Sequence, residues 1–381
     1  MVSNSNCRLL YFSPAWFGGL ADYAHEQAQA LGQMGVQVTL LTAPAYRKEE
    51  TNLYKVERVL KTLDGLRTSH PLIRKTFLAA TILQNYVILA QTIQNQDFRY
   101  VLLGSYSEYL APLWVNSLRK LGRQGVTFGA VIHDPVRDYV VGPLWWHRWS
   151  IACGYSFLQE AFVHEDIALD TARPMPNLRT TVIPHGSFEF LPPQKSQEQV
   201  RAEMKIPQQA KVLLSFGHIR DNKNLDLALK AIACFPDIYL LVAGKVTSST
   251  QRPITYYQDL AHTLGIAERC RWLIDFIPED QVGNLFNACD AVLLTYSATF
   301  QSASGVLNAA VAYRRPCIAS AGSGNLRTVV QKYHLGIFVE PDNLDATRNG
   351  IHLWLNNTVK PKWEDYKRDN SWRKNAEVVY R

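Results

Sequence analysis

One segment of the sequence indicates the fold most clearly, because an apolar run, a loop of small residues, a helix-like run and a second apolar run follow one another in it. It reads Asp290-Ala-Val-Leu-Leu-Thr-Tyr-Ser-Ala-Thr-Phe-Gln-Ser-Ala-Ser-Gly-Val-Leu-Asn-Ala-Ala-Val-Ala-Tyr-Arg-Arg-Pro-Cys-Ile-Ala319. Short, continuous apolar runs are typical of strands buried on both faces of a parallel sheet. A helix beginning at Ser304-Gly305 would point its backbone N–H groups and its positive dipole end at a phosphate. The alternative is an ordinary strand-loop-helix unit whose small residues only permit close packing.

The same rhythm extends from this stretch in both directions. In the second half of the chain, the buried strands that we predict are 212–216, 238–243, 270–275, 291–295, 316–320 and 336–339. In the first half, they are 9–13, 36–42, 100–104, 126–133, 160–164 and 180–184. Helix-like segments lie between most of them. The pattern therefore predicts an α/β protein with doubly wound parallel sheets, whose ligands bind at the carboxyl ends of the strands.

A polar, proline-containing stretch between residues 187 and 210 interrupts this rhythm and predicts a linker. The length of 381 residues also favours two domains over one large core. We therefore expect two Rossmann-like domains, residues 1–187 and 188–360, that face each other across a cleft.

Composition narrows the classes of function. Lys and Arg together number 40 against 33 Asp and Glu, a net charge of +7. This mild excess suits an anionic small ligand, a phosphate-bearing substrate or an acidic membrane surface, and it is too small to indicate a nucleic acid partner. Hydrophobic residues make up 47% of the chain and charged residues 19%, which excludes a disordered chain.

The cysteines and the apolar segments indicate a cytoplasmic protein. Six cysteines are scattered without a CxxC pair, so we interpret them as reduced and mostly buried. Residues 1–6 lack the basic and then apolar order of a secretory signal, so export is not expected. Between residues 76 and 96 polar residues interrupt an uncharged segment, which predicts a long, largely buried helix rather than a membrane span.

A glycine pair follows the first predicted strand. In Ser13-Pro-Ala-Trp-Phe-Gly-Gly-Leu20, Gly18 and Gly19 join this strand to a helix that begins near Ala21. Paired glycines let backbone N–H groups approach a ligand oxygen closely, and helix N-termini attract anions. The pair could otherwise form only a tight strand-to-helix turn.

Two cations follow the first strand of the second half. In Phe216-Gly-His-Ile-Arg-Asp-Asn-Lys-Asn-Leu225, Arg220 and Lys223 are three residues apart at the start of a helix, where they could grip a diphosphate. The sequence GxxxxGK[ST] of P-loop proteins is absent. A solvated basic loop is the alternative interpretation.

In this order, the pieces resemble the GT-B glycosyltransferases, in particular the retaining family 4 enzymes (glycosyl transferases group 1), over nearly the whole chain. The glycine pair with its helix resembles the family's glycine loop, and residues 216–223 resemble its Arg/Lys diphosphate grip. Phe276-Ile-Pro-Glu-Asp-Gln-Val282 and residues 296–305 resemble its nucleotide-binding stretch. The resemblance makes residues 1–187 an acceptor domain and residues 188–360 a sugar-nucleotide donor domain. Residues 361–381 resemble the closing helix that returns to the first domain.

The resemblance also implies a set of site residues. Those implied to bind the donor are Gly18, Gly19, Arg220, Lys223, Phe276, Ile277, Ser304, Gly305, Val306, Leu307 and Ala309. Those implied to act at the reacting sugar are His133, Asp134 and Gln301. His133 ends a predicted strand and resembles the family histidine that lies near the transferred sugar. His185, between Pro184 and Gly186, could line the same cleft or belong to a hinge.

One departure from the family pattern concerns two glutamates eight positions apart. In the family the first usually reaches the donor sugar and the second the ribose. Counted back from Pro316, Gln301 and Ala309 occupy their places here. Some relatives with a Gln-Ser-Gly sequence also lack the pair, so the departure leaves the donor open and supports a catalytically silent protein as an alternative.

An aromatic cluster, Trp145-Trp-His-Arg-Trp149, follows Gly142-Pro143. Its composition is that of a membrane-interface or sugar-stacking surface. A helix that buries its tryptophans in the core is the alternative.

The resemblance implies an enzyme, of the kind used in polysaccharide biosynthesis, that moves a sugar from a nucleotide diphosphate-sugar donor to a glycan, lipid-linked or small-molecule acceptor with retention. Cations and helix N–H groups would stabilise the leaving diphosphate, so no metal and no cofactor are expected, and the sequence has no DxD motif. The expected location is the cytoplasm, with peripheral contact to the inner face of a membrane as an option. The alternatives are a silent sugar-nucleotide-binding or scaffold subunit, a sugar-nucleotide epimerase and a phosphorylase.

Overall fold

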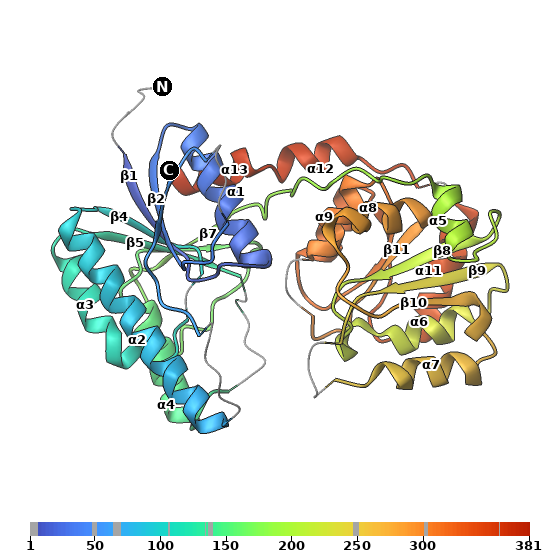
Figure 1. The fold of residues 1–381 in the computed structure, drawn as a ribbon, viewed down its shortest axis with the longest axis horizontal. Helices are drawn as coiled ribbons and strands as arrows, with labels where there is room; N and C mark the ends of the chain where they lie inside the picture. Colours follow the sequence, from blue (N-terminus) through green and yellow to red (C-terminus); the bar gives the residue numbers. More distant parts are fainter. Residues whose placement is uncertain are drawn as a thin grey trace. The chain divides into compact units, whose positions relative to one another are not determined.

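The computed structural model describes residues 7–47, 52–63, 70–105, 107–133, 135, 140–246, 251–300, 304–357 and 359–381. The chain forms two compact units (Figure 1). The first unit contains residues 1–186 and 371–381, and the second contains residues 187–370.

The first unit is built on a seven-stranded parallel sheet in the order β3-β2-β1-β4-β5-β6-β7. Its strands are β1 (Arg8–Phe12), β2 (Gln37–Thr42), β3 (Lys55–Arg58), β4 (Tyr100–Leu103), β5 (Thr127–Ile132), β6 (Glu160–Val163) and β7 (Arg179–Val182). All the expected strands of this half are present. Strand β3 was not expected, because its sequence Lys-Val-Glu-Arg lacks the apolar run of a central strand and it lies at the sheet edge.

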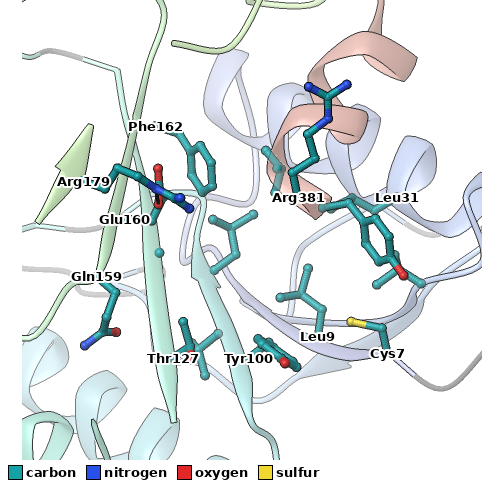
Figure 2. A pocket seen from close by; sticks show the side chains of 16 residues that line it. Cys7, Leu9, Leu31, Tyr100, Thr127, Gln159, Glu160, Phe162, Arg179 and Arg381 are labelled. Atoms are coloured by element: carbon teal, nitrogen blue, oxygen red, sulfur yellow. Dashed lines mark hydrogen bonds and ion pairs between the residues drawn. The ribbon is translucent and has the colours of Figure 1, made fainter. Parts of the chain in front are cut away.

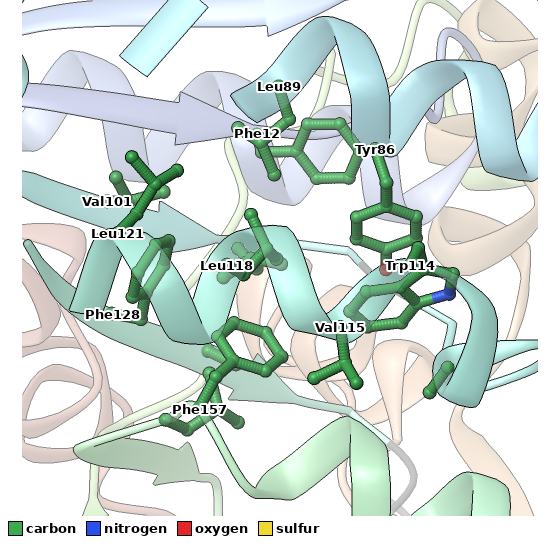
Figure 3. Packing of buried hydrophobic residues seen from close by; sticks show 14 of the residues in the cluster. Phe12, Tyr86, Leu89, Val101, Trp114, Val115, Leu118, Leu121, Phe128 and Phe157 are labelled. Atoms are coloured by element: carbon green, nitrogen blue, oxygen red, sulfur yellow. The ribbon is translucent and has the colours of Figure 1, made fainter. Parts of the chain in front are cut away.

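Helices cover both faces of this sheet (Figure 1). On one face α1 (Gly19–Gln33) and α13 (Trp372–Tyr380) share a core with the sheet. On the other face lie α2 (Pro71–Asn95), α3 (Ala111–Arg123) and α4 (Leu144–Tyr155). Figure 3 shows this second core, in which the rings of Tyr86 and Trp114 stack 3.6 Å apart. Aromatic packing thus fixes α2 and α3 on the same sheet face.

The prediction of a largely buried helix at 76–96 is wrong for half of that helix. The C-terminal half of α2 packs into the core through Tyr86, Leu89 and Ile93. Residues 72–78 are all exposed, however. A helix of 25 residues is about 37 Å long, whereas strands of four to six residues span about 13–20 Å, so α2 is longer than the sheet that it covers.

The second unit is built on a six-stranded parallel sheet in the order β10-β9-β8-β11-β12-β13. Its strands are β8 (Lys211–Phe216), β9 (Ile238–Ala243), β10 (Cys270–Leu273), β11 (Ala291–Thr295), β12 (Cys317–Ser320) and β13 (Gly336–Phe338). Its helices are α5 (Gln197–Glu203), α6 (Leu225–Ile232), α7 (Ile254–Thr263), α8 (Glu279–Ala288), α9 (Gly305–Ala312), α10 (Asn325–Lys332), α11 (Leu344–Asn356) and α12 (Trp363–Asp369). The strands predicted for this half are all present, because the central ones are continuous apolar runs that the sheet buries on both faces. Strand β10 lies at the sheet edge and contains Arg271.

The C-terminal segment is divided between the two units. Helix α12 packs on the second unit through Tyr366, whose hydroxyl donates a 2.6 Å hydrogen bond to Asn308 Oδ1 in α9. Only residues 371–381, with α13, belong to the first unit. The boundary expected at residue 361 therefore moves to residue 371, because a buried tyrosine holds the intervening helix to the second unit.

Candidate functional site

At the carboxyl edge of the first sheet, the glycine pair ends the loop that follows β1. Gly18 has φ +74°, a conformation that favours glycine, and helix α1 begins at Gly19. The Gly18 carbonyl accepts hydrogen bonds from the N–H groups of Ala21 and Asp22. The Asp22 carboxylate in this first turn is paired with Arg47. The loop is open, since a Cβ at either glycine would meet nothing within 4 Å.

His133 follows β5 at the same edge. Its Nε2 lies 3.0 Å from the carbonyl oxygen of Gly104, and because a carbonyl only accepts, Nε2 carries the proton and donates. The neutral ring then has Nδ1 as its acceptor. Gly104 allows this arrangement, since a Cβ there would lie 2.1 Å from the ring of Tyr11.

Two further histidines join His133 around Tyr23 of α1. The Tyr23 ring lies 4.6 Å from that of His133, 5.4 Å from His164 and 5.6 Å from His185. His185 therefore belongs to this cluster, and Gly186 beside it has φ +79° and packs against Trp372. Sequence reasoning missed His164, although it follows the apolar strand β6 just as His133 follows β5.

The tyrosine is held by a helix from the far end of the chain. Asn375 of α13 is fully buried, and its Nδ2 donates to the Tyr23 hydroxyl at 2.8 Å and to the Pro184 carbonyl at 2.7 Å. Gln27 Nε2 donates to Asn375 Oδ1 at 2.6 Å, and Tyr11 donates to Gln27 Oε1. This buried network fixes the floor beneath the histidines.

Burial keeps the three imidazoles neutral. It lowers the pKa of His133 to about 4 and that of His185 to about 4, and it holds the pKa of His164 well below its ordinary value. Because a protonated neighbour disfavours a second charge, the histidines also lower one another's pKa. At neutral pH this edge therefore offers hydrogen-bonding imidazoles and no positive charge from them.

The second unit gathers cations and a helix N-terminus at its own carboxyl edge. Gly217, just after β8, has φ +86°, and a Cβ there would lie 3.4 Å from Lys223 Nζ and 3.6 Å from Val306 of α9. Lys223 Nζ also donates to the Phe216 carbonyl at 3.0 Å. The structure thus brings Lys223 to the beginning of α9, whereas Arg220 is exposed in the same loop.

The loop that carries these cations is anchored on both sides. Asp221 Oδ1 accepts hydrogen bonds from Tyr257 Oη at 3.0 Å and from the N–H of Arg252 at 3.1 Å. On the other side, Thr295 Oγ1 at the end of β11 donates to the Lys223 carbonyl at 3.0 Å. Lys223 is therefore held in place before any ligand binds.

Burial, and then the charge of Arg220, lowers the pKa of Lys223 to about 8. A bound anion would favour the charged ammonium and raise this pKa again. Within the described part of the chain, the ammonium of Lys223 therefore lacks a nearby negative charge, which a bound anion would supply.

Helix α9 begins where the sequence predicts it. Ser304 is its N-cap, and the Ser304 side chain accepts from the Leu307 N–H at 3.3 Å. The Tyr296 hydroxyl lies 2.8 Å from Ser304 Oγ. The N–H of Leu307 is therefore engaged by the N-cap. The N–H groups of Gly305 and Val306 are the first helical ones that a ligand could reach.

The remaining predicted residues differ in position. Ala309 is buried in the core of the second unit, so its methyl group cannot reach a ligand as a glutamate would. Phe276, after β10, is 78% exposed, and Ile277 packs partly against the core. Asp134 and Gln301 lie outside the described residues.

Within the described residues, no group of three or more His, Cys, Asp and Glu side chains could hold a metal ion. The described cysteines are free, and four of the six are buried, whereas Cys234 is exposed. A cavity of about 720 Å³ lies at the amino edge of the first sheet, where Arg179 pairs with Glu160 (Figure 2). Because it is at the edge opposite to the histidines, we assign it no part in the site.

The fold is that of the GT-B glycosyltransferases of known structure. A sucrose-phosphate synthase from Thermosynechococcus elongatus superposes with a TM-score of 0.65 at 18% identity, over 98% of this chain and 94% of that one. Anabaena HepE, solved in complex with UDP and glucose, superposes with a TM-score of 0.62 at 15% identity, over 98% and 94% of the chains. At such identities the likeness shows the fold alone, and it confirms the prediction of two parallel-sheet α/β domains.

Residues 196–379 match the family model described as glycosyl transferases group 1. This match covers slightly less than half of the chain, and it agrees with the resemblance seen in the sequence. A D-inositol 3-phosphate glycosyltransferase of Mycobacterium marinum is 29% identical over 153 residues, which are 39% of this chain and 31% of that protein. The chain thus aligns with less than a third of the length of this curated relative. The matches support a sugar-transfer function.

Proposed function

We propose that this protein is a retaining glycosyltransferase that uses a nucleotide diphosphate-sugar donor without a metal ion. The observation that carries the proposal is the meeting of Lys223 with the N-terminus of α9 at Gly217. A lysine ammonium and unpaired helical N–H groups are the natural partners of a diphosphate. Arg220 adds a second, exposed cation from the same loop.

The chemistry then needs little from side chains. The bond between the anomeric carbon and the diphosphate oxygen breaks, and the bond to the acceptor oxygen forms on the same face of the sugar. The acceptor proton passes to the departing diphosphate, whose charge the lysine and the helix stabilise. These groups supply the positive charge for which other enzymes use a metal ion.

His133 is the group of the first unit that we assign to the reacting sugar. Its Nε2–H is engaged by Gly104, so Nδ1 can accept a hydrogen bond from a sugar hydroxyl. Since its pKa is about 4, the ring stays neutral at pH 7 and orients the sugar rather than donating a proton. We place acceptor binding in the first unit and donor binding in the second.

The similar proteins favour a uridine nucleotide and a phosphorylated acceptor as the first compounds to test. HepE was solved with UDP and with UDP-glucose. The curated relative is named for D-inositol 3-phosphate. The acceptor classes that we propose are a glycan, a lipid-linked glycan and a small molecule.

A thermal-shift screen against nucleoside diphosphates and sugar nucleotides tests the donor part of the proposal. A ligand that binds only the native state raises the melting temperature, and the stabilisation grows with the logarithm of its concentration over Kd. We expect at least one sugar nucleotide to do so and to be hydrolysed slowly without acceptor. Binding of none of them would contradict the proposal.

One observation favours a second candidate, a silent sugar-nucleotide-binding subunit. Ala309 stands at the place of a family glutamate and is buried, so it offers no hydrogen bond to a ribose. Donor binding without hydrolysis or transfer, across a panel of acceptors, would favour this candidate over the enzyme.

A further inference from the structure

The first unit exposes apolar side chains at the beginnings of two helices. In α2, Leu72 is 65% exposed and Phe77 49%, and Ile73 and Leu78 are exposed as well. In α4, Trp145 is 65% exposed, Leu144 61% and Trp149 42%. The alternative of a helix that buries all its tryptophans therefore fails for Trp145 and Trp149.

Both helix beginnings lie toward the same edge of the sheet. A helix that connects two parallel strands runs back from the carboxyl edge to the amino edge, so its N-terminus lies at the carboxyl edge. Helix α2 connects β3 to β4, and α4 connects β5 to β6. Both helices pack into one core on the same sheet face, where α3 contacts each of them. The exposed apolar residues are thus at the edge that carries His133.

Within the two helices the charge has one sign. Arg74 and Lys75 are exposed among the apolar residues of α2, and Arg148 is exposed beside Trp149. No Asp or Glu occurs between residues 70 and 96 or between residues 140 and 159. Exposed tryptophans with basic neighbours are typical of surfaces that lie in the headgroup region of a bilayer.

From these observations we infer that residues 72–78 of α2 and 144–149 of α4, which we call the α2/α4 surface, bind the surface of an anionic lipid bilayer. The carboxyl edge that carries His133 would then be near the headgroups, where a lipid-linked acceptor presents its sugar or phosphate. This part of the inference rests on the proposed function and selects the lipid-linked class from its acceptors. It also locates the enzyme at the cytoplasmic face of the membrane, where anionic lipids are found.

In this inference, helix α2 lies on the membrane surface and does not cross the bilayer. By length and composition, Leu72–Asn95 is apolar enough to span a bilayer. Its second half, however, packs into the core through Tyr86, Leu89 and Ile93, so those side chains are not available to lipid. Only the exposed first half can enter the headgroup region.

Vesicle cosedimentation of the full chain tests the surface without any need for activity. We expect binding to vesicles that contain phosphatidylglycerol and much weaker binding to pure phosphatidylcholine. Arg74→Gln with Lys75→Gln should weaken binding by about thirtyfold, because each basic residue near an anionic surface contributes about five- to sixfold. Phe77→Ser with Trp145→Ser should weaken it by about tenfold or more, because both side chains lose their burial in lipid.

Matched controls come from the second unit. Leu355→Ser removes an apolar side chain of 37% exposure from α11, and Lys360→Gln removes an exposed charge. Neither should change vesicle binding. Melting temperatures close to that of the parent protein would show that the variants fold, as expected for exposed positions.

Three outcomes would overturn the inference. They are no binding to anionic vesicles, equal binding to neutral and anionic vesicles, and self-association of the protein that Phe77→Ser abolishes, which would make a second copy the partner. Transfer assays separate this inference from the proposed function. Vesicle binding without sugar transfer would support the membrane-binding surface and contradict the proposed glycosyltransferase activity. Sugar transfer without vesicle binding would support the activity and contradict the membrane-binding surface.

Discussion

At the carboxyl edge of the first sheet, strand ends carry histidines whose rings pack around Tyr23, whereas at the same edge of the second sheet they carry Lys223 beside the beginning of α9. Burial makes both sets of groups less basic, because it disfavours the charged form. The consequence differs, since an imidazole with a pKa of about 4 is neutral at pH 7 and an ammonium with a pKa of about 8 is still charged. Similar positions at the carboxyl edges thus yield neutral imidazoles in one unit and a charged ammonium, the proposed anion site, in the other.

The largest effect that we expect follows from removing the imidazole of the first unit. His133→Ala should lower kcat by about a hundredfold or more, a usual range for a group that contacts the reacting atoms. Nucleotide affinity should not change, because we propose that the nucleotide binds the second unit. Steady-state kinetics and calorimetry measure the two quantities.

The matched control for this variant is His262→Ala, which removes an exposed imidazole of α7. If His133→Ala lowered nucleotide affinity and left kcat intact, the assignment of roles to the two edges would be reversed.

The buried network beneath the histidines should show the next largest effect. Asn375→Ala removes the group that donates to Tyr23 and Pro184, so it leaves buried polar atoms without partners. The free energy of unfolding should fall by about 2–4 kcal/mol in a denaturant titration. The control is Asn356→Ala at an exposed position of α11, which should lower the free energy of unfolding by less than about 0.5 kcal/mol. An equal cost for both variants would show that the network contributes little.

Loss of the buried cation should weaken donor binding alone. Lys223→Ala should raise the Kd for a nucleoside diphosphate by about ten- to a hundredfold, because a hydrogen bond to a charged group contributes about 1.5–3 kcal/mol. Lys230→Ala on α6, whose ammonium pairs with Asp226, is the control and should leave Kd unchanged. Unchanged affinity in both Arg220→Ala and Lys223→Ala, measured by calorimetry, would show that the diphosphate binds elsewhere.

The pKa of Lys223 gives a pH dependence of definite sign. Below about pH 8 the ammonium is charged, and as the pH rises through this value the free site loses its charge. The Kd for a nucleoside diphosphate should therefore increase by about tenfold for each pH unit above pH 8, and Lys223→Ala should abolish this slope. A slope that survives in the variant would have to come from another group.

The smallest effect concerns metal ions. Because a lysine and a helix N-terminus supply positive charge at the proposed diphosphate site, EDTA should leave turnover unchanged. Activity that is lost in chelator and restored by magnesium or manganese would contradict metal independence.

The strands other than β3, the division of the chain into two sheets and the beginning of α9 could be predicted from the sequence. Each of these is local: an apolar run predicts a buried strand, and Ser304 can cap the helix that follows it. The same local pattern indicated His133 and Lys223, since the loop that follows a parallel strand lies at the carboxyl edge of the sheet.

The side chains that surround those residues depend on tertiary packing. Tyr23, His164 and Asn375 are far apart in the sequence, and they meet because α13 packs beside α1 on the first sheet. No periodicity can show such a contact, since it depends on long-range packing. The exposure of Leu72 and Phe77 likewise depends on the length of α2 relative to the sheet, and the burial of Ala309 depends on the face that α9 turns to its core. Sequence patterns specify each element, but the packing of elements against one another specifies which side chains a ligand or a membrane can reach.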